Sequence, residues 1–177
     1  ALSHRAVFNQ LDAYARAMAL RKAAADLDAL LIVNDRCDLA MAVDADGVHL
    51  GQDDLPYEQA RRLLGPDKLI GISTHNAEQV KEAERLKPDY IGFGPIFTPG
   101  SKKDHDPVVG IEGLAGIRPL TSRPIFAIGG IQLDRVRSVM QSGANGIAVV
   151  SAILSAADVK RAVRDFIAQL PCPARPI

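Results

Sequence analysis

The sequence has few cysteines and no excess of charge of either sign. The cysteines among its 177 residues are Cys37 and Cys172, which lie far apart and belong to no Cys-x-x-Cys motif. This usage argues against a disulfide scaffold or a structural zinc site and is typical of a reduced, cytoplasmic protein. Lys plus Arg and Asp plus Glu each number 21, so the formal net charge is +0. Without a global positive field, duplex nucleic acid is not an expected partner.

Long apolar runs are also missing from the sequence. None approaches the roughly 18 residues of a membrane-spanning helix, and the first residues do not have the pattern of a signal peptide. No predicted strand is followed by GxGxxG or GxxxxGK[ST], the glycine-rich loops of nucleotide-binding sheets. The length and the 47% of hydrophobic residues instead predict one globular domain over residues 1–177, with no membrane partner and a cytoplasmic location.

Short apolar runs alternate with helix-like segments along the whole chain. The runs predict strands at residues 30–33, 47–50, 69–72, 90–93, 125–128 and 147–150. Helices are predicted at residues 7–25, 38–43, 56–64, 77–86, 111–120, 133–142 and 156–170. In the first of these, Leu11, Tyr14 and Met18 recur near the helical period, which indicates an amphipathic helix. The alternation predicts a parallel sheet, as an open doubly wound sheet or as a (β/α)8 barrel.

One short turn occurs twice in variant form. Ala45-Asp46-Gly47-Val48 begins one predicted strand and Ala144-Asn145-Gly146-Ile147 begins another. Such a repeat indicates a series of similar βα units rather than two unlike domains.

Polar residues gather where the first predicted strands end, which is the edge where parallel α/β folds place their sites. Asn34 and Asp35 follow one strand, and Asp53 and Asp54 follow the next. Two carboxylates at neighbouring strand ends suit Mg2+, but the same residues suit the N-terminal capping of the following helices. The spacing leaves both interpretations open, as it does the choice between Asp53 and Asp54. His49 lies inside an apolar run and is interpreted as a core histidine.

Later strand ends carry groups suited to anions. Ser73 and Asn76 precede a helix, which one of the polar residues there is expected to cap. The long loop over residues 94–107 contains lysines and hydroxyls and is interpreted as an active-site lid. Gly129-Gly130 and Val150-Ser151 follow the last two strands, where barrels commonly bind phosphate, and this pairing favours the barrel over the open sheet.

Taken as a set, these segments resemble the thiamine phosphate synthase superfamily, which also contains a thiazole tautomerase. The resemblance covers nearly the whole chain and rests on residues 32–36, 46–56, 71–75, 90–97, 127–131 and 149–153. It implies a (β/α)8 barrel that joins hydroxymethylpyrimidine diphosphate to hydroxyethylthiazole phosphate and releases pyrophosphate. Small-molecule substrates are therefore the expected partners. Because proteins of this superfamily are commonly oligomeric, the resemblance also allows a homo-oligomer.

The resemblance also assigns roles to residues of this sequence. Asp35 and Asp54 match the ligands of a Mg2+ ion. The residues that match contacts to the pyrimidine diphosphate are Asn34, Ser73 and Lys102, of which Ser73 and Lys102 are the expected catalytic pair. Contacts to the thiazole phosphate fall on Pro99, Gly100, Ser101, Gly130, Val150 and Ser151. Relatives usually carry two threonines in the lid, where this sequence has Pro99 and Ser101.

Two further expectations follow from the resemblance. Relatives open with two strands and a diphosphate-binding Gln-x-Arg-x-Lys-like string, all of which would precede Ala1. The first two strands of the barrel are therefore expected to be missing from this chain. The alternatives to the synthase are a tautomerase with His75 as its acid or base and a catalytically inactive protein that binds thiazole phosphate.

Overall fold

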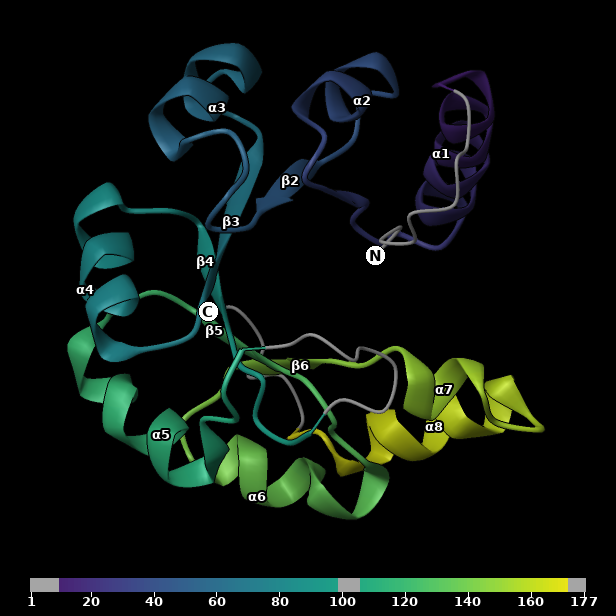
Figure 1. Ribbon diagram of the computed structural model, residues 1–177. Helices are drawn as coiled ribbons and strands as arrows, with labels where there is room; N and C mark the ends of the chain where they lie inside the picture. Colours follow the sequence, from purple (N-terminus) through teal and green to yellow (C-terminus); the bar gives the residue numbers. More distant parts are fainter. Residues whose placement is uncertain (1–9, 99–105, 172–177) are drawn as a thin grey trace, which may run out of the picture. The chain divides into compact units, whose positions relative to one another are not determined.

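The computed structural model describes residues 10–98 and 106–171, in which strands and helices alternate (Figure 1). The strands are β1 (Ile32–Asn34), β2 (Gly47–Leu50), β3 (Leu69–Thr74), β4 (Tyr90–Phe93), β5 (Ile125–Ile128) and β6 (Gly146–Ala148). The α-helices are α1 (Gln10–Asp26), α2 (Cys37–Ala42), α3 (Tyr57–Leu64), α4 (Ala77–Leu86), α5 (Gly110–Ile117), α6 (Val136–Gln141), α7 (Ser151–Leu154) and α8 (Val159–Gln169). Two 3-10 helices, η1 (Arg118–Leu120) and η2 (Leu133–Arg135), complete the described elements.

The strands form one sheet whose order follows the chain from β1 to β6. Strand β1 pairs with β2, β2 with β3, β4 with β5 and β5 with β6, in each case in parallel. The predicted α/β class with a parallel sheet is thus confirmed. The eight strands of a full barrel are not reached, because residues 10–98 and 106–171 contain six. No described helix is both long enough and apolar enough for a membrane span.

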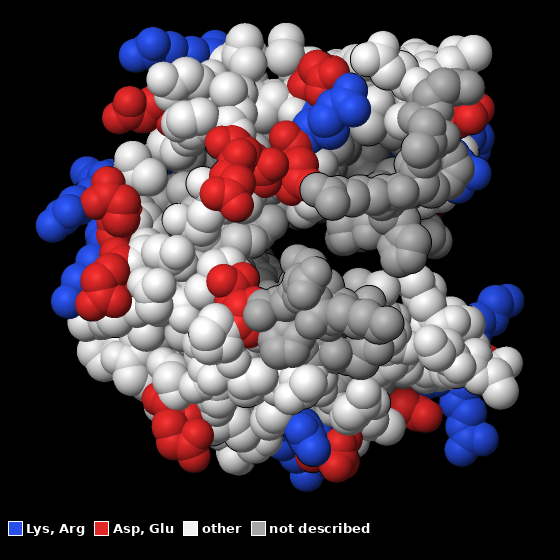
Figure 2. All heavy atoms as spheres, viewed as in Figure 1, with Lys and Arg blue, Asp and Glu red and all other residues white. Residues whose placement is uncertain are grey.

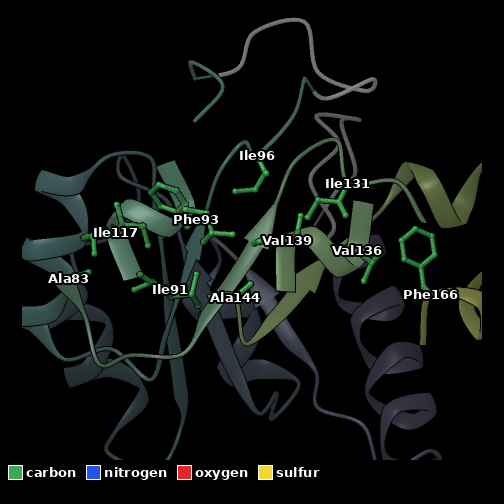
Figure 3. Packing of buried hydrophobic residues seen from close by; sticks show 14 residues of the cluster. Ala83, Ile91, Phe93, Ile96, Ile117, Ile131, Val136, Val139, Ala144 and Phe166 are labelled. Atoms are coloured by element: carbon green, nitrogen blue, oxygen red, sulfur yellow. The ribbon is translucent and has the colours of Figure 1, made fainter. Parts of the chain in front are cut away.

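The chain divides into two compact units, residues 1–73 and 74–177, each with its own core. In the first unit, β1, β2 and β3 pack against α2 and α3 through the buried residues Val33, Ala40, Val48, Leu50, Ala60 and Ile70. The core of the second unit is larger. It joins β4 and β5 to α4, α5, α6 and α8 through residues that include Ile91, Phe93, Leu114, Ile125, Val139 and Phe166 (Figure 3).

The repeated turn of the sequence is a repeated structural clamp, which confirms that its two copies are equivalent. Asp46 donates its backbone N–H to the carbonyl of Leu31 (3.0 Å) and accepts the N–H of Leu31 on its side chain (2.7 Å). Asn145 makes the same pair of bonds with Ile125, at 2.8 and 2.9 Å. Each side chain also accepts a bond of 3.1 Å from an arginine, Arg21 or Arg118. A short polar side chain before one strand thereby fixes where the preceding strand begins.

The glycine that follows each clamp is required by close packing. A Cβ atom on Gly47 would lie 2.2 Å from the carbonyl oxygen of Leu69, at the start of β3. A Cβ atom on Gly146 would lie 2.6 Å from the ring of Phe126 in β5. Because real Cβ contacts are longer than this, only glycine lets the neighbouring strands approach so closely.

Several helix boundaries differ from the prediction for local reasons. The helix expected over residues 111–120 ends as α5 at Ile117 and continues as η1, where Pro119 cannot supply a helical N–H. The helix expected over residues 156–170 begins only at Val159, because Asp158 caps it by accepting the N–H of Arg161 at 2.9 Å. The short helix α7 was not predicted.

Helix α1 forms as predicted but does not bury its apolar stripe. Ala17 is its buried residue, whereas Leu11 is 73% exposed and Tyr14 and Met18 are also exposed. The apolar positions that predicted an amphipathic helix are therefore not buried against the described residues. The helix meets α2 through the small Ala17, which leaves its larger apolar side chains outside the first core.

Glu84 connects α4 to the turn that precedes β5. Its carboxylate accepts hydrogen bonds from the hydroxyl of Thr121, from the backbone N–H of Ser122 (3.1 Å) and from the hydroxyl of Ser122 (2.9 Å). These bonds to the charged form, the Thr121 bond above all, hold the pKa of Glu84 below its usual value of 4.5. The carboxylate therefore joins α4 to residues 121 and 122 through hydrogen bonds whose strength depends on its ionisation, and hence on pH.

We expect Glu84→Gln to lower the free energy of unfolding by about 1–2 kcal/mol near neutral pH, because charged acceptors make the stronger hydrogen bonds. A carboxyl with a lowered folded-state pKa contributes fully above its unfolded pKa and loses that contribution as pH falls through the folded pKa. The gap between parent and variant should thus narrow at acidic pH, once the pH has fallen below the usual carboxyl pKa of 4.5, as urea unfolding at neutral and at acidic pH would measure. Glu82→Gln on the same helix, which breaks an exposed ion pair with Arg85, should cost less than about 0.5 kcal/mol. A gap for Glu84→Gln that is the same at both pH values would contradict this role.

Candidate functional site

The first predicted site residues lie together at the carboxyl ends of β1 and β2. Asn34 is opposite His49 in the parallel register, and the N–H of Asp35 donates to the carbonyl of His49 at 2.8 Å. Asp35 has a φ of 63°, a left-handed conformation that aspartate tolerates better than most residues. Its carboxylate accepts a bond of 2.5 Å from the Asn34 amide and is exposed. The end of β1 thus presents a carboxylate and an amide side by side.

The structure distinguishes Asp54 from Asp53. The turn after β2 brings the carboxylate of Asp54 back to the N–H of Gly51, which it accepts at 2.6 Å, next to the last residue of the strand. Asp54 is half-buried there, whereas Asp53 is exposed. Figure 2 shows acidic side chains gathered over the region of β2, between α2 and α3.

The capping interpretation of these carboxylates is wrong. Helix α2 begins after Arg36 and helix α3 after Pro56, and neither start has a side-chain capping bond. Asp38, in the first turn of α2, instead receives two bonds from the guanidinium of Arg36, at 2.7 and 2.5 Å. These bonds hold the pKa of Asp38 below its usual range. With capping set aside, Asp35 and Asp54 have no structural role at a helix start.

The donor set at this edge is small. In the described parts of the chain, no group of three or more His, Cys, Asp and Glu side chains forms a metal cage. Two carboxylates at adjacent strand ends, with the Asn34 amide beside the carboxylate of Asp35, match the incomplete protein ligation that is usual for Mg2+, whose remaining ligands are water and substrate phosphate oxygens. The residues present therefore fit a cation that is shared with an anionic substrate, and not a closed structural site.

Ser73, at the end of β3, is held from two directions. Its hydroxyl lies 2.9 Å from Nε2 of His49, and its carbonyl accepts a bond of 2.5 Å from the Gln52 side chain. Burial lowers the pKa of His49 to about 4, against the opposing effect of the Asp54 charge, so the ring is neutral at pH 7. The sequence interpretation of His49 as a core residue missed this contact with a predicted site residue. The signal was its register, because Gly71 opposite His49 leaves Ser73 as the next side chain on that face.

In the second unit, the end of β3 positions His75. The buried Thr74 donates its hydroxyl to the carbonyl of Gly92, and the Nδ1 side of the His75 ring lies 2.6 Å from the carbonyl oxygen of Gly94. Nε2 of His75 lies 3.6 Å from the carboxylate of Asp106. The expected cap of the next helix is Asn76, which accepts the N–H of Gln79 at 2.9 Å. His75 therefore has a fixed ring with one nitrogen near a carboxylate.

The glycine pair after β5 supports the segment that leads toward residue 99. Gly129 and Gly130 have φ values of 96° and 62°, which disfavour other residues. The carbonyl of Gly129 accepts the N–H of Phe97 at 3.0 Å, and a Cβ atom on Gly130 would lie 2.7 Å from the carbonyl oxygen of Thr98. The pair thus lets two backbone segments meet closely, a packing role that the sequence prediction of a phosphate site did not include.

The remaining predicted residues fall into two groups. Val150 and Ser151 lie where β6 gives way to α7, and Ser151 is the first residue of that helix. Because Ile128 is opposite Ala148, the residues that follow β5 and β6 leave the sheet at the same edge. Pro99, Gly100, Ser101 and Lys102 lie outside the described residues.

Comparisons with known proteins agree on one family. The family described as thiamine monophosphate synthase matches residues 5–153. A thiamine-phosphate synthase of Moorella thermoacetica is 47% identical over 146 residues, which are 82% of this chain and 70% of the relative. One from Chloroflexus aurantiacus is 53% identical over 136 residues, which are 77% of this chain and 62% of the relative.

Solved structures give the same result. A thiamine phosphate pyrophosphorylase of Pyrococcus furiosus is 38% identical and superimposes with a TM-score of 0.84, over 93% of this chain and 78% of its own. An orotidine 5'-phosphate decarboxylase of Pyrococcus horikoshii, at 16% identity and a TM-score of 0.65, shares the fold alone. The resemblance seen in the sequence is confirmed, and the chain belongs to the thiamine monophosphate synthase family.

Proposed function

We propose that this protein is a Mg2+-dependent transferase that joins hydroxymethylpyrimidine diphosphate to hydroxyethylthiazole phosphate and releases pyrophosphate. The observation that carries the proposal is the group of polar side chains at the ends of β1, β2 and β3, in a chain that belongs to this family. Asn34, Asp35, Asp54 and Ser73 all lie at that edge, and none of them is needed there to cap a helix. The family's activity accounts for them better than any structural role.

Asp35 and Asp54 would hold the Mg2+ ion. Their carboxylates project from neighbouring strand ends, and the ion's other ligands would come from the diphosphate and from water. When bound, the ion neutralises negative charge on the departing pyrophosphate. The hydrogen bonds from Asn34 to Asp35 and from Gly51 to Asp54 orient the two carboxylates before any substrate arrives.

The chain's other residues bind and orient the two substrates. Asn34 and Ser73 would contact the pyrimidine diphosphate, and Lys102 would add positive charge near the leaving group. The methylene carbon attached to the pyrimidine ring loses its bond to the diphosphate oxygen and gains a bond to the thiazole nitrogen. No covalent intermediate with the enzyme is therefore needed. Positioning and electrostatic stabilisation then supply the catalysis. The thiazole phosphate would contact backbone groups of Gly130, Val150 and Ser151 and the lid residues Pro99, Gly100 and Ser101.

We also propose a fold, a location and an assembly for this protein. Residues 1–177 would be part of one (β/α)8 barrel domain that acts on small molecules in the cytoplasm, and a homo-oligomer is allowed. The relatives from Moorella thermoacetica and Chloroflexus aurantiacus are both synthases, which favours this function over the others. One observation favours a thiazole tautomerase as second candidate: His75 has a fixed ring with Nε2 near the carboxylate of Asp106, an arrangement suited to proton transfer. A tautomerase would need no metal.

The proposed activity is tested by pyrophosphate release with both substrates, with and without Mg2+. We expect thiamine phosphate as the product, strict dependence on Mg2+, and a fall of about 100-fold or more in kcat/KM for Asp35→Asn or Asp54→Asn, because each removes a charged ligand. The matched control is Asp53→Asn, which should stay within about twofold of the parent because the Asp53 side chain is exposed. Proton exchange in a thiazole carboxylate phosphate without metal, together with no pyrophosphate release, would favour the tautomerase instead.

Gly130→Ala tests the placement of the thiazole phosphate. The new Cβ atom would strain a left-handed backbone and meet Thr98, so we expect a loss of stability of about 1–2 kcal/mol. The KM for the thiazole phosphate should rise about tenfold while the KM for the pyrimidine diphosphate stays near the parent value. Gly116→Ala is the control, because nothing lies within 4 Å of a Cβ there. Equal changes in both KM values would show that Gly130 acts on folding and not on the thiazole site.

A further inference from the structure

The hydroxyl of Ser73 meets a side chain that the proposed reaction does not yet use. His49 projects from the middle of the site edge, between Asn34 on β1 and Gly71 on β3. Since Gly71 has no side chain, the imidazole reaches along that face to the next residue on it, and Nε2 stops 2.9 Å from the Ser73 oxygen. This contact is between a half-buried ring and a residue predicted to bind substrate.

The backbone around this contact is fixed as well. Gln52 donates a hydrogen bond of 2.5 Å from its side-chain amide to the carbonyl of Ser73. Both the hydroxyl and the backbone carbonyl of Ser73 are therefore hydrogen-bonded. Gln52 belongs to the turn that Asp54 closes through its bond to the N–H of Gly51. The position of Ser73 is therefore set by the same turn that places a proposed metal ligand.

A serine hydroxyl has one donor hydrogen that rotates to suit its surroundings and two acceptor lone pairs. A neutral imidazole nitrogen is either a donor or an acceptor, so its bond to Ser73 commits one side of the hydroxyl and leaves the other for a ligand. A hydroxyl that is already oriented does not have to lose rotational freedom when the substrate binds. The contact therefore has a consequence for binding and not only for packing.

We propose that His49 is a positioning residue that orients the Ser73 hydroxyl toward the pyrimidine diphosphate. The inference rests on the proposed function and adds to it the side chain that sets the direction of this substrate contact. Two features favour it over a histidine that merely fills the core. Nε2 of His49 contacts the hydroxyl of Ser73, and the hydrogen bond from Gln52 holds the backbone of Ser73 in place.

A double-mutant cycle on kcat/KM for the pyrimidine diphosphate tests the inference. We expect His49→Leu alone to lower kcat/KM about tenfold, the usual effect of one lost hydrogen bond at a substrate contact. The KM for the thiazole phosphate should not change. In a Ser73→Ala background, His49→Leu should have almost no further effect, because the group through which it acts is gone. His49→Gln, whose amide can donate or accept, should recover activity to within about threefold of the parent.

Control variants separate positioning from folding. Thr121→Val removes a buried hydroxyl in the second unit and should lower the melting temperature without changing either KM. If His49→Leu does not fold, the cycle is run with His49→Gln and His49→Asn, of which the shorter Asn should be the worse because its amide cannot reach Ser73. Each variant's melting temperature is measured alongside its kinetics.

The outcomes distinguish the two proposals. A parent protein that releases no pyrophosphate would overturn the proposed function. A parent that is active, with the same fold-loss for the His49 change whether or not Ser73→Ala is also present, would overturn the positioning role alone. A rise in the KM of both substrates, or a well-folded His49→Gln that is no better than His49→Leu, would do the same.

Discussion

The interaction on which the rest of the structure depends is the clamp that begins its strands. Asp46 and Asn145 each bind both backbone groups of a residue at the start of the preceding strand, and each is bound by an arginine. The clamp fixes parallel register at the amino end of the sheet, and a glycine directly after it lets a neighbouring strand approach closely. Since strands are stiff over their short length, fixing one end also fixes which residues meet at the other end. In the first unit, that other end carries the proposed site.

The site is a consequence of this register. With Leu31 clamped by Asp46, Asn34 falls opposite His49, and His49 falls opposite Gly71. The groups that come next in the chain after these paired residues are thereby placed at the same edge of the sheet. They are Asp35, Ser73 and the turn from Gly51 to Asp54. A shift of β1 by one residue against β2 would turn Asn34 to the face of the sheet opposite His49 and separate these groups. The chemistry of the edge therefore depends on hydrogen bonds at the opposite end of the same strands.

The sequence predicted the features that local pattern controls. The strands 47–50, 90–93 and 125–128 and the helix 77–86 have the expected bounds, because apolar runs and a capping Asn76 mark them. The capping role of Asp35 and Asp54 could not be decided, since spacing does not reveal which way a carboxylate turns. The exposure of Leu11 and the contact of His49 with Ser73 were missed because they depend on what lies opposite each side chain. The roles given to Pro99, Gly100, Ser101 and Lys102 stay predictions.

The central claim is that Asp35 and Asp54 form an incomplete cation site that an anionic leaving group completes. It is tested most directly by titrating the protein with Mn2+ as a probe for Mg2+, following free Mn2+ by electron paramagnetic resonance, with and without pyrophosphate. The account predicts one ion per chain, bound about tenfold or more tightly when pyrophosphate is present and lost when both aspartates become asparagine. Unchanged Mn2+ binding by that double variant, or binding that pyrophosphate does not strengthen, would contradict it.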